Sequence, residues 1–120
     1  QFSGATIECR INAEDPFDNF RPSPGLIEKW SVPGADDPNI RVDTHVSTGY
    51  EVPVYYDSLL CKVITKGETR DEACDRMIDV LENMVCDGVS TTVPMHLQIL
   101  RDDSFRSHNY NTGKIPGFKE

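Results

Sequence analysis

The sequence predicts an α+β fold with a mostly antiparallel sheet, and two observations carry that prediction. Strand-like segments fill the chain up to about residue 66, whereas helical periodicity begins only near residue 69. Strands that precede helices, rather than alternating with them, are typical of α+β folds. The length of 120 residues and the hydrophobic content of 38% fit one globular domain over residues 1–120.

The first strand is expected at residues 4–12, where apolar and polar side chains alternate. Successive side chains on a strand point to opposite faces of the sheet. We therefore expect Ile7, Cys9 and Ile11 on one face, and Arg10 with its polar neighbours on the other.

Four more strand-like segments follow, separated by stretches rich in Pro, Gly, Asp and Asn, which favour turns. The stretch that begins at the double tyrosine is expected to form a turn or a short helical element. The strands are expected at residues 25–32, 40–46, 49–53 and 60–66, and the connections at residues 13–24, 33–39 and 55–60.

The best-defined helix is expected to begin near Thr69. Thr69 and Glu72 fit a capping box, in which the hydroxyl accepts from the third amide and the carboxylate reaches back. Apolar residues then recur at three- and four-residue spacing as far as Val85, and Gly88 is a natural stop. A second helix is expected to begin with Pro94 in its first turn, before a polar tail. Its apolar residues are Leu97, Ile99 and Leu100.

Charge and composition exclude several classes of function. A net charge of −8 argues against a general affinity for nucleic acid or anionic membranes. No apolar run approaches membrane-spanning length, and no signal peptide opens the sequence. The three histidines show no metal-ligand spacing, and neither a P-loop nor a G-x-G-x-x-G turn occurs.

The four cysteines show no C-x-x-C spacing and occupy apolar-periodic positions, so we expect structural thiols in a reducing compartment. A cytoplasmic location follows as an expectation. The four are Cys9, Cys61, Cys74 and Cys86.

Arg10 is the leading candidate for a functional side chain. A strand would hold its planar, charged, five-donor guanidinium group on rigid backbone and aim it at one side of the sheet. Such a group suits a carboxylate, bicarbonate or phosphate. From the residues alone, an arginine on the polar face of a strand is more often a solvated or ion-paired surface residue.

Six blocks of the sequence, in order and with nearly unbroken spacing, resemble the C-terminal domain of biotin carboxylase. The resemblance runs from about Gly4 to about Asn111, with departures at Ala5-Thr6, Arg21 and Val54. The blocks are ECRINAEDP, FRPSPGLIEKW, RVDTHV, GYEVPVYYDSLLCKVI, GETRDEA and GVSTTVPMHLQIL.

The resemblance implies a curved antiparallel sheet flanked by helices and a part in biotin carboxylation. The family is an ATP-dependent ligase that carboxylates biotin with bicarbonate, as in acetyl-CoA carboxylase of fatty acid biosynthesis. The implied partners are a biotin carboxyl carrier domain, a carboxyltransferase component and a second copy of the parent protein. ATP and Mg²⁺ or Mn²⁺ would be bound by an ATP-grasp domain. That domain and the N-terminal domain are absent from this sequence, so the fragment alone is expected to be inactive.

The final acceptor is left open by the sequence. The stretch 91–94 is similar to the acetyl-CoA carboxylase type. The equivalent domain of a pyruvate, propionyl-CoA, methylcrotonyl-CoA or urea carboxylase is the alternative. A non-catalytic module for dimerisation or docking is a further one.

The resemblance implies roles for Arg10 and Arg41, and sequence position suggests roles for Asp57, Asn12 and Glu14. Arg10 matches the family's bicarbonate-binding arginine, which makes it a catalytic and substrate-binding residue. Asp57 would orient Arg10, lie beside the biotin pocket or cap a turn. Asn12 and Glu14 would support Arg10 or belong to a turn and edge-strand network. Arg41 is similar to an arginine near the family's homodimer surface. No metal ligand is expected in this fragment.

Overall fold

The computed structural model describes residues 4–34, 36–53, 58–102, 105 and 118–119. Its longest elements are two strands and one helix, which build the centre of the domain. In chain order the elements are β1 (Ala5–Asn12), β2 (Glu14–Asp15), β3 (Arg21–Pro22), β4 (Gly25–Leu26), β5 (Lys29–Ser31), β6 (Ile40–Thr44), β7 (Glu51–Val52), β8 (Leu59–Gly67), α1 (Arg70–Glu82), β9 (Val85–Asp87), α2 (Val93–Leu100) and β10 (Phe118–Lys119).

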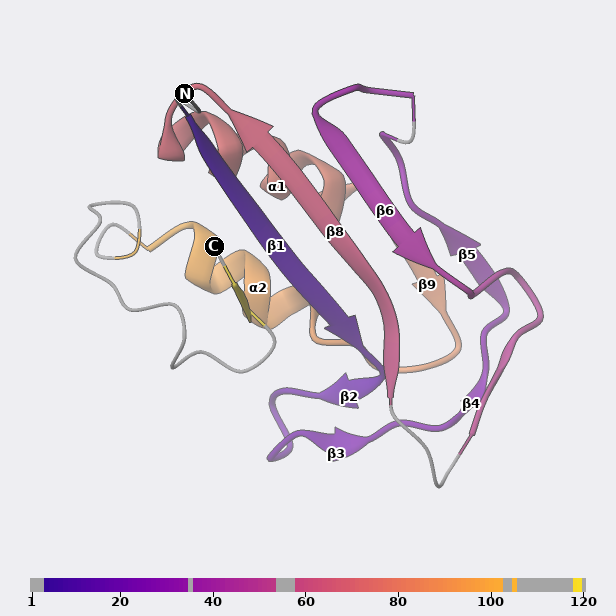
Figure 1. Cartoon of the computed structure of the whole chain (residues 1–120). Coiled ribbons are helices and arrows are strands. Elements are labelled where there is room, and N and C mark those ends of the chain that lie inside the picture. The colour runs from indigo at the N-terminus through magenta and orange to yellow at the C-terminus, as the bar shows by residue number, and fades with distance from the viewer. Residues whose placement is uncertain (1–3, 35, 54–57, 103–104, 106–117, 120) are drawn as a thin grey trace.

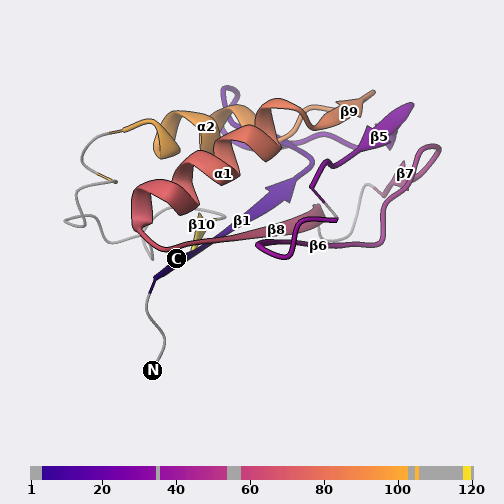
Figure 2. The same cartoon turned by 90° about the horizontal axis from the view of Figure 1, so that it is seen from above.

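The main sheet has four strands in the order β10-β1-β8-β6, and every pair is antiparallel. Both helices lie on the same side of this sheet (Figures 1 and 2). The predicted α+β fold with a mostly antiparallel, curved sheet and flanking helices is thus confirmed. The opposite side of the sheet is called the open face below, because no described element covers it.

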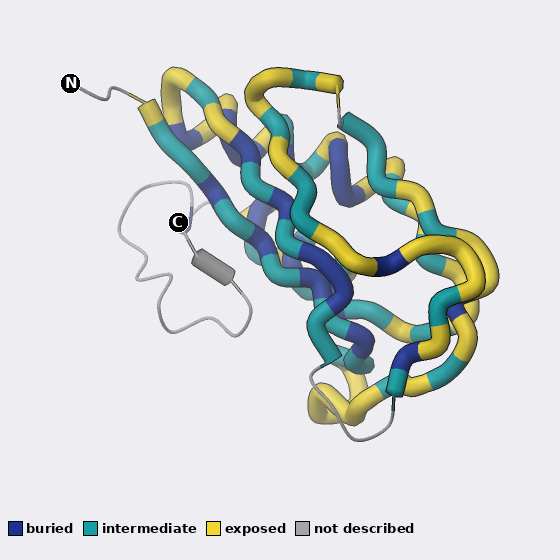
Figure 3. Tube along the Cα trace, turned by 45° about the vertical axis from the view of Figure 1, so that its right-hand side comes forward, coloured by how far each residue is buried: buried dark blue, intermediate teal, exposed yellow. Residues whose placement is uncertain are grey.

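The expected alternation along β1 is confirmed, and it shows which face of the sheet is buried. Ile7, Cys9 and Ile11 are fully buried, whereas the residues between them are partly exposed (Figure 3). The buried side chains belong to the same core cluster as Met77 and Leu81 of α1. Burial of apolar surface between the sheet and this helix stabilises the fold, at about 25 cal/mol per Å².

A β-bulge at the end of the β1–β8 pair joins the main core to a second one. The register shifts between Ile11 and Asn12, so that Leu60 is left out of the Cα pairing. Leu60 and Cys61 are consequently both buried, although they are consecutive. Such an extra residue bends the strand. Leu60 therefore enters the second core, whose other members are Ala13, Ile27, Val46 and Val52.

The predicted connection at residues 13–24 contains a small hairpin, because β2 pairs with β3. The strand predicted at residues 25–32 is also divided. Its first half, β4, pairs with β7, and its second half, β5, pairs with β9. The partner changes at Ile27 and Glu28, whose amides donate to Tyr50 O and Asp87 O. No local sequence pattern reports such a change of partner.

The prediction that the first helix runs on to a stop at Gly88 is wrong. Helix α1 ends at Glu82, where Asn83 caps it by donating its backbone and side-chain N–H groups to Asp79 O. The next residues form β9, so Val85 belongs to a strand. Gly88 instead lies in the turn after β9, with φ +114° and room for no Cβ, which would come 2.1 Å from Leu26 O.

The predicted helix starts are confirmed. Thr69 Oγ1 accepts from the Glu72 amide at 3.1 Å, and the Glu72 carboxylate reaches back to the Glu68 amide at 2.9 Å, one residue before the cap. Helix α2 begins at Val93 with Pro94 in its first turn. No described helix is long and apolar enough to cross a membrane.

Sequence reasoning missed one core residue beyond α2. Phe105 is fully buried, although it lies in the stretch that we expected to be a polar tail. Its carbonyl oxygen accepts from Arg70 Nε at 2.9 Å, and its ring lies 4.3 Å from the Arg70 guanidinium carbon. The arginine therefore anchors this part of the chain to the start of α1 through a hydrogen bond and a cation–π contact.

Candidate functional site

Arg10 lies on β1 and points to the open face of the main sheet. Its neighbours Cys9 and Ile11 are buried on the helix side, so strand alternation turns Arg10 the other way. Its side chain is 38% exposed. The guanidinium group is thus attached to the longest paired strands of the fold while remaining accessible.

One carboxylate of the same strand contacts Arg10. Glu8 Oε2 lies 3.2 Å from Arg10 Nε. This contact is made by Nε, so it leaves out the two Nη amino groups, which can bind a planar anion as a fork. An ion pair this exposed contributes only about 0–1 kcal/mol to stability. Glu8 can therefore orient the Arg10 side chain without preventing it from binding an anionic ligand.

The open face carries more positive than negative charge, although the chain as a whole has a net charge of −8. Strand register and alternation place basic side chains of three neighbouring strands on it, with two acidic ones between them. This local excess favours an anionic ligand. The basic residues are Arg10, Arg41, Lys62 and Lys66, and the acidic ones are Glu8 and Asp43.

The remaining predicted site residues do not all gather at Arg10. Asn12 shares its strand, and its buried Oδ1 has no hydrogen-bond partner among the described residues. Glu14 instead accepts a hydrogen bond from Ser58 Oγ at 2.8 Å, which connects β2 to the residue just before β8. Arg41 lies on β6 and pairs with Asp43 at 3.0 Å. Asp57 lies outside the described residues.

Sequence reasoning missed Thr92 and His96, which hold the backbone of Arg10 from the start of α2. Both side chains are buried, with exposures of 3% and 0%. His96 Nε2 lies 2.8 Å from Arg10 O. A histidine between Met95 and Leu97 on an apolar helix was the available signal, because a buried imidazole requires a hydrogen-bond partner.

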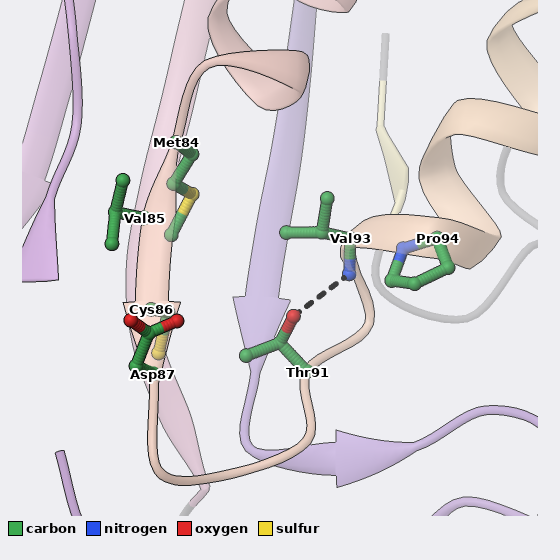
Figure 4. Close-up of a pocket in the computed structure, with 7 residues that line it drawn as sticks. All are labelled: Met84, Val85, Cys86, Asp87, Thr91, Val93 and Pro94. Carbon is green, nitrogen blue, oxygen red and sulfur yellow. Dashed lines mark hydrogen bonds between the residues drawn. The ribbon is translucent and has the colours of Figure 1, made fainter. Parts of the chain in front are cut away.

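A pocket of about 290 Å³ that Arg10 does not line is found between β9 and the start of α2 (Figure 4). Cys86 is the one thiol that lines it, and burial followed by the charge of Asp87 raises the pKa of that thiol to about 11. A thiol with so high a pKa is a poor nucleophile at neutral pH. The thiol therefore does not mark this pocket as a nucleophilic site. The residues that line the pocket are Met84, Val85, Cys86, Asp87, Thr91, Val93 and Pro94.

The four cysteines are free thiols, as predicted. Burial raises the pKa of Cys9 well above its usual value and that of Cys61 to about 12. Within the described residues, no three histidine, cysteine or acidic side chains come together as a metal site. The candidate site is thus the open face around Arg10.

Known proteins share both the sequence and the structure of this chain. Residues 8–116 match the family model for the biotin carboxylase C-terminal domain. Biotin carboxylase 1 of Bacillus subtilis (strain 168) is 49% identical over 112 residues, which cover 93% of this chain and 24% of that protein. The small subunit of 2-oxoglutarate carboxylase from Hydrogenobacter thermophilus is 46% identical, with 93% of this chain and 23% of that protein covered.

Solved structures agree with this assignment. The biotin carboxylase domain of a thermophilic 2-oxoglutarate carboxylase bound to bicarbonate has a TM-score of 0.87 and 45% identity, covering 92% of this chain and 25% of that one. The biotin carboxylase subunit of a pyruvate carboxylase has a TM-score of 0.84 and 46% identity, covering 89% and 23%. The chain spans about a quarter of the length of these relatives. It belongs to the biotin carboxylase C-terminal domain family.

Proposed function

We propose that this chain contributes Arg10 to the composite active site of a biotin carboxylase. The reaction would use ATP and bicarbonate to carboxylate biotin on a carrier domain. Family membership and a structural relative described as bound to bicarbonate support this proposal. The single observation that carries it is the geometry of Arg10, an accessible guanidinium on a strand whose face has excess positive charge.

Arg10 would act first on bicarbonate and then on biotin. Its planar fork would hold the bicarbonate oxygens while that anion attacks the γ-phosphate of ATP, which would give carboxyphosphate and release ADP. Carboxyphosphate would then break down to carbon dioxide and phosphate. When the ureido nitrogen of biotin gives its proton to a general base elsewhere in the parent protein, negative charge would grow on the ureido oxygen. The same guanidinium would stabilise that charge while the nitrogen attacks carbon dioxide to form carboxybiotin. Removing one such preorganised donor typically costs about 10²–10³ in turnover.

The residues described here do not fit a nucleotide or a magnesium ion. The sequence contains no P-loop or G-x-G-x-x-G turn, and no cluster of metal-ligating groups occurs among the described residues. ATP and its Mg²⁺ or Mn²⁺ would therefore be held by an ATP-grasp domain of the parent protein. This chain alone would not turn over.

The parent protein would act with three partners. A biotin carboxyl carrier domain would bring biotin to Arg10, and a carboxyltransferase would use the product. A second copy would complete a dimer, since one relative is described as a biotin carboxylase domain dimer. Arg41, exposed on the edge strand β6, is our candidate for the dimer contact. Cytoplasmic location also belongs to this proposal.

We propose acetyl-CoA as the final acceptor, because the stretch 91–94 is similar to the acetyl-CoA carboxylase type. The alternatives are 2-oxoglutarate and pyruvate, since relatives with those names also match most of this chain. This stretch serves the local fold as well, because Thr92 bonds to β1 and Thr91 Oγ1 accepts from the Val93 amide at 3.3 Å. Assaying the parent protein with its own carboxyltransferase and each acceptor would distinguish the three.

The test of the proposed function is turnover of the intact parent protein with Arg10→Ala and Arg10→Lys. We expect bicarbonate-dependent ATP hydrolysis and free-biotin carboxylation to fall by about 10²–10³ in Arg10→Ala, with ATP affinity preserved. Arg10→Lys should recover little, because lysine lacks the planar fork. The control is Arg21→Ala, which removes an exposed arginine paired with Asp18 on the β2–β3 hairpin. Unchanged turnover with altered association would instead assign the chain to docking or dimerisation.

A further inference from the structure

The outer edge of β1 is held by a small set of contacts from α2. On its inner side β1 pairs with β8 along its whole length, including Arg10 with Lys62. On its outer side, within the part of the chain that the structure describes, β10 pairs at Glu8 and Cys9. Beyond that point the backbone of β1 would present unpaired polar groups, which a sheet edge must satisfy or cover. Helix α2 begins there.

Thr92 makes hydrogen bonds to two residues on the outer edge of β1. Its amide donates to Asn12 O at 3.1 Å, and its Oγ1 accepts from the Asn12 amide at 3.0 Å. The same hydroxyl donates to Arg10 O at 3.4 Å. Thr92 is the N-cap of α2, a position whose hydroxyl ordinarily bonds to the first turn of its own helix, and here it does not. This hydroxyl forms hydrogen bonds with β1 instead.

His96 makes the shorter contact to the same carbonyl. Because a carbonyl oxygen only accepts, Nε2 of His96 must donate to Arg10 O at 2.8 Å. The imidazole is fully buried, and that burial lowers its pKa to about 4, so the ring is neutral at pH 7 and carries its proton on Nε2. The Arg10 carbonyl thus receives two hydrogen bonds from side chains one helical turn apart on α2.

We propose that His96, with Thr92, is a positioning residue that fixes the backbone of Arg10 so that its guanidinium meets bicarbonate and the biotin ureido oxygen. This inference rests on the proposed function of Arg10. The guanidinium lies at the end of a long side chain, so a small rotation of the Arg10 backbone displaces the fork by a larger distance. A misplacement of about 1 Å costs on the order of 10²-fold in rate. Pairing with β8 fixes one edge of the strand, and His96 and Thr92 fix the other.

The test uses the intact parent protein carrying His96→Ala or His96→Gln. We expect His96→Ala to lower kcat/KM for bicarbonate by about ten- to a hundredfold while KM for ATP changes less than about twofold. His96→Gln should restore most of this loss, since its amide can donate at the position of Nε2. The control is Leu100→Ala, a buried residue one turn further along α2. It should lower Tm and leave kcat/KM for bicarbonate unchanged.

Thr92 supplies a second, milder test if His96→Ala does not fold. Thr92→Val removes the hydroxyl at nearly constant shape, whereas Thr92→Ser keeps it. We expect several-fold lower kcat/KM for bicarbonate in Thr92→Val and near wild-type values in Thr92→Ser. Equal values in the two variants, or a His96→Gln protein as impaired as His96→Ala, would overturn the positioning role.

A double-mutant cycle separates this inference from the proposed function. If His96 acts through Arg10, His96→Ala should cause no further loss once Arg10→Ala is present. A full additional loss in the double variant overturns the positioning role while the function of Arg10 stands. An Arg10→Ala protein with wild-type turnover overturns both.

Discussion

Arg10 and Lys62 lie opposite each other on adjacent antiparallel strands, so two cations share one position of the open face. Like charges that face each other across a sheet are destabilising unless an anion lies between or beside them. Glu8 contacts Arg10 Nε at 3.2 Å, whereas Asp43 faces Lys62 from β6 but accepts from Arg41 Nε at 3.0 Å. The cations at this position therefore outnumber the carboxylate that contacts them, which favours an anionic ligand.

Neutralising Lys62 should therefore weaken bicarbonate binding without harming the fold. For Lys62→Met in the intact protein we expect KM for bicarbonate to rise several-fold, with kcat changed less and Tm equal or higher. Lys66→Met is the matched control, because Lys66 lies on the same strand and face but pairs with Thr6. Equal effects of the two variants on KM would contradict a local role for Lys62.

His96 should make stability pH-dependent between about pH 4 and 6.5. Burial lowers its folded-state pKa to about 4 from 6.5, so the unfolded chain binds more protons in this window. Stability is fully present above pH 6.5 and is lost as pH falls toward 4, by up to about 3 kcal/mol. Thermal unfolding of wild type and His96→Gln between pH 7 and 5 measures this loss of stability. We expect the Tm of the variant to change less with pH than that of the wild type. Parallel profiles would show that His96 does not titrate in this way.

Gly88 should tolerate no side chain. A Cβ there would lie 2.1 Å from Leu26 O, and φ is +114°. Gly49 supplies the control, since its φ is +92° but a Cβ would meet nothing within 4 Å. Gly49→Ala should cost about 1–2 kcal/mol of unfolding free energy from backbone strain alone. Gly88→Ala should cost a further ~1–3 kcal/mol from the clash. Similar denaturation midpoints for the two variants would argue against this close approach.

The contact between Arg70 and Phe105 should stabilise the domain. Arg70→Ala removes a buried hydrogen bond and a cation–π contact, so we expect a loss of about 2–3 kcal/mol. Phe105→Ala should cost about 3–5 kcal/mol, because it empties a fully buried position. Arg101→Ala is the control, as its side chain is 50% exposed and pairs with Glu82 on the surface. Chemical denaturation of the three variants tests this, and an equal loss in Arg101→Ala would contradict it.

The parts of the fold that the sequence could predict are those fixed by local pattern. The alternation around Arg10, the cap at Thr69 and the place of Pro94 in a first helical turn are properties of a few adjacent residues, and all three are confirmed. The division of residues 25–32 between two partners and the strand at Val85 depend on segments far away in the chain. Periodicity within a short apolar stretch cannot distinguish such a strand from the end of a helix.

The candidate site shows the same limit. Arg10 could be selected because its face follows from alternation and its role from the resemblance. His96 could not, because its function depends on one carbonyl oxygen that is 86 residues earlier in the chain. A buried polar residue in an apolar helix indicates that a partner exists, but not which one.

A crystal structure of the intact parent protein with bicarbonate would show whether the guanidinium of Arg10 binds that anion. We predict a bicarbonate oxygen at hydrogen-bond distance, about 2.7–3.2 Å, from the Nη groups of Arg10, with Arg10 O still bonded to His96. A bicarbonate ion bound in the active site by other residues, with Arg10 turned away from it, would refute the proposed role of Arg10.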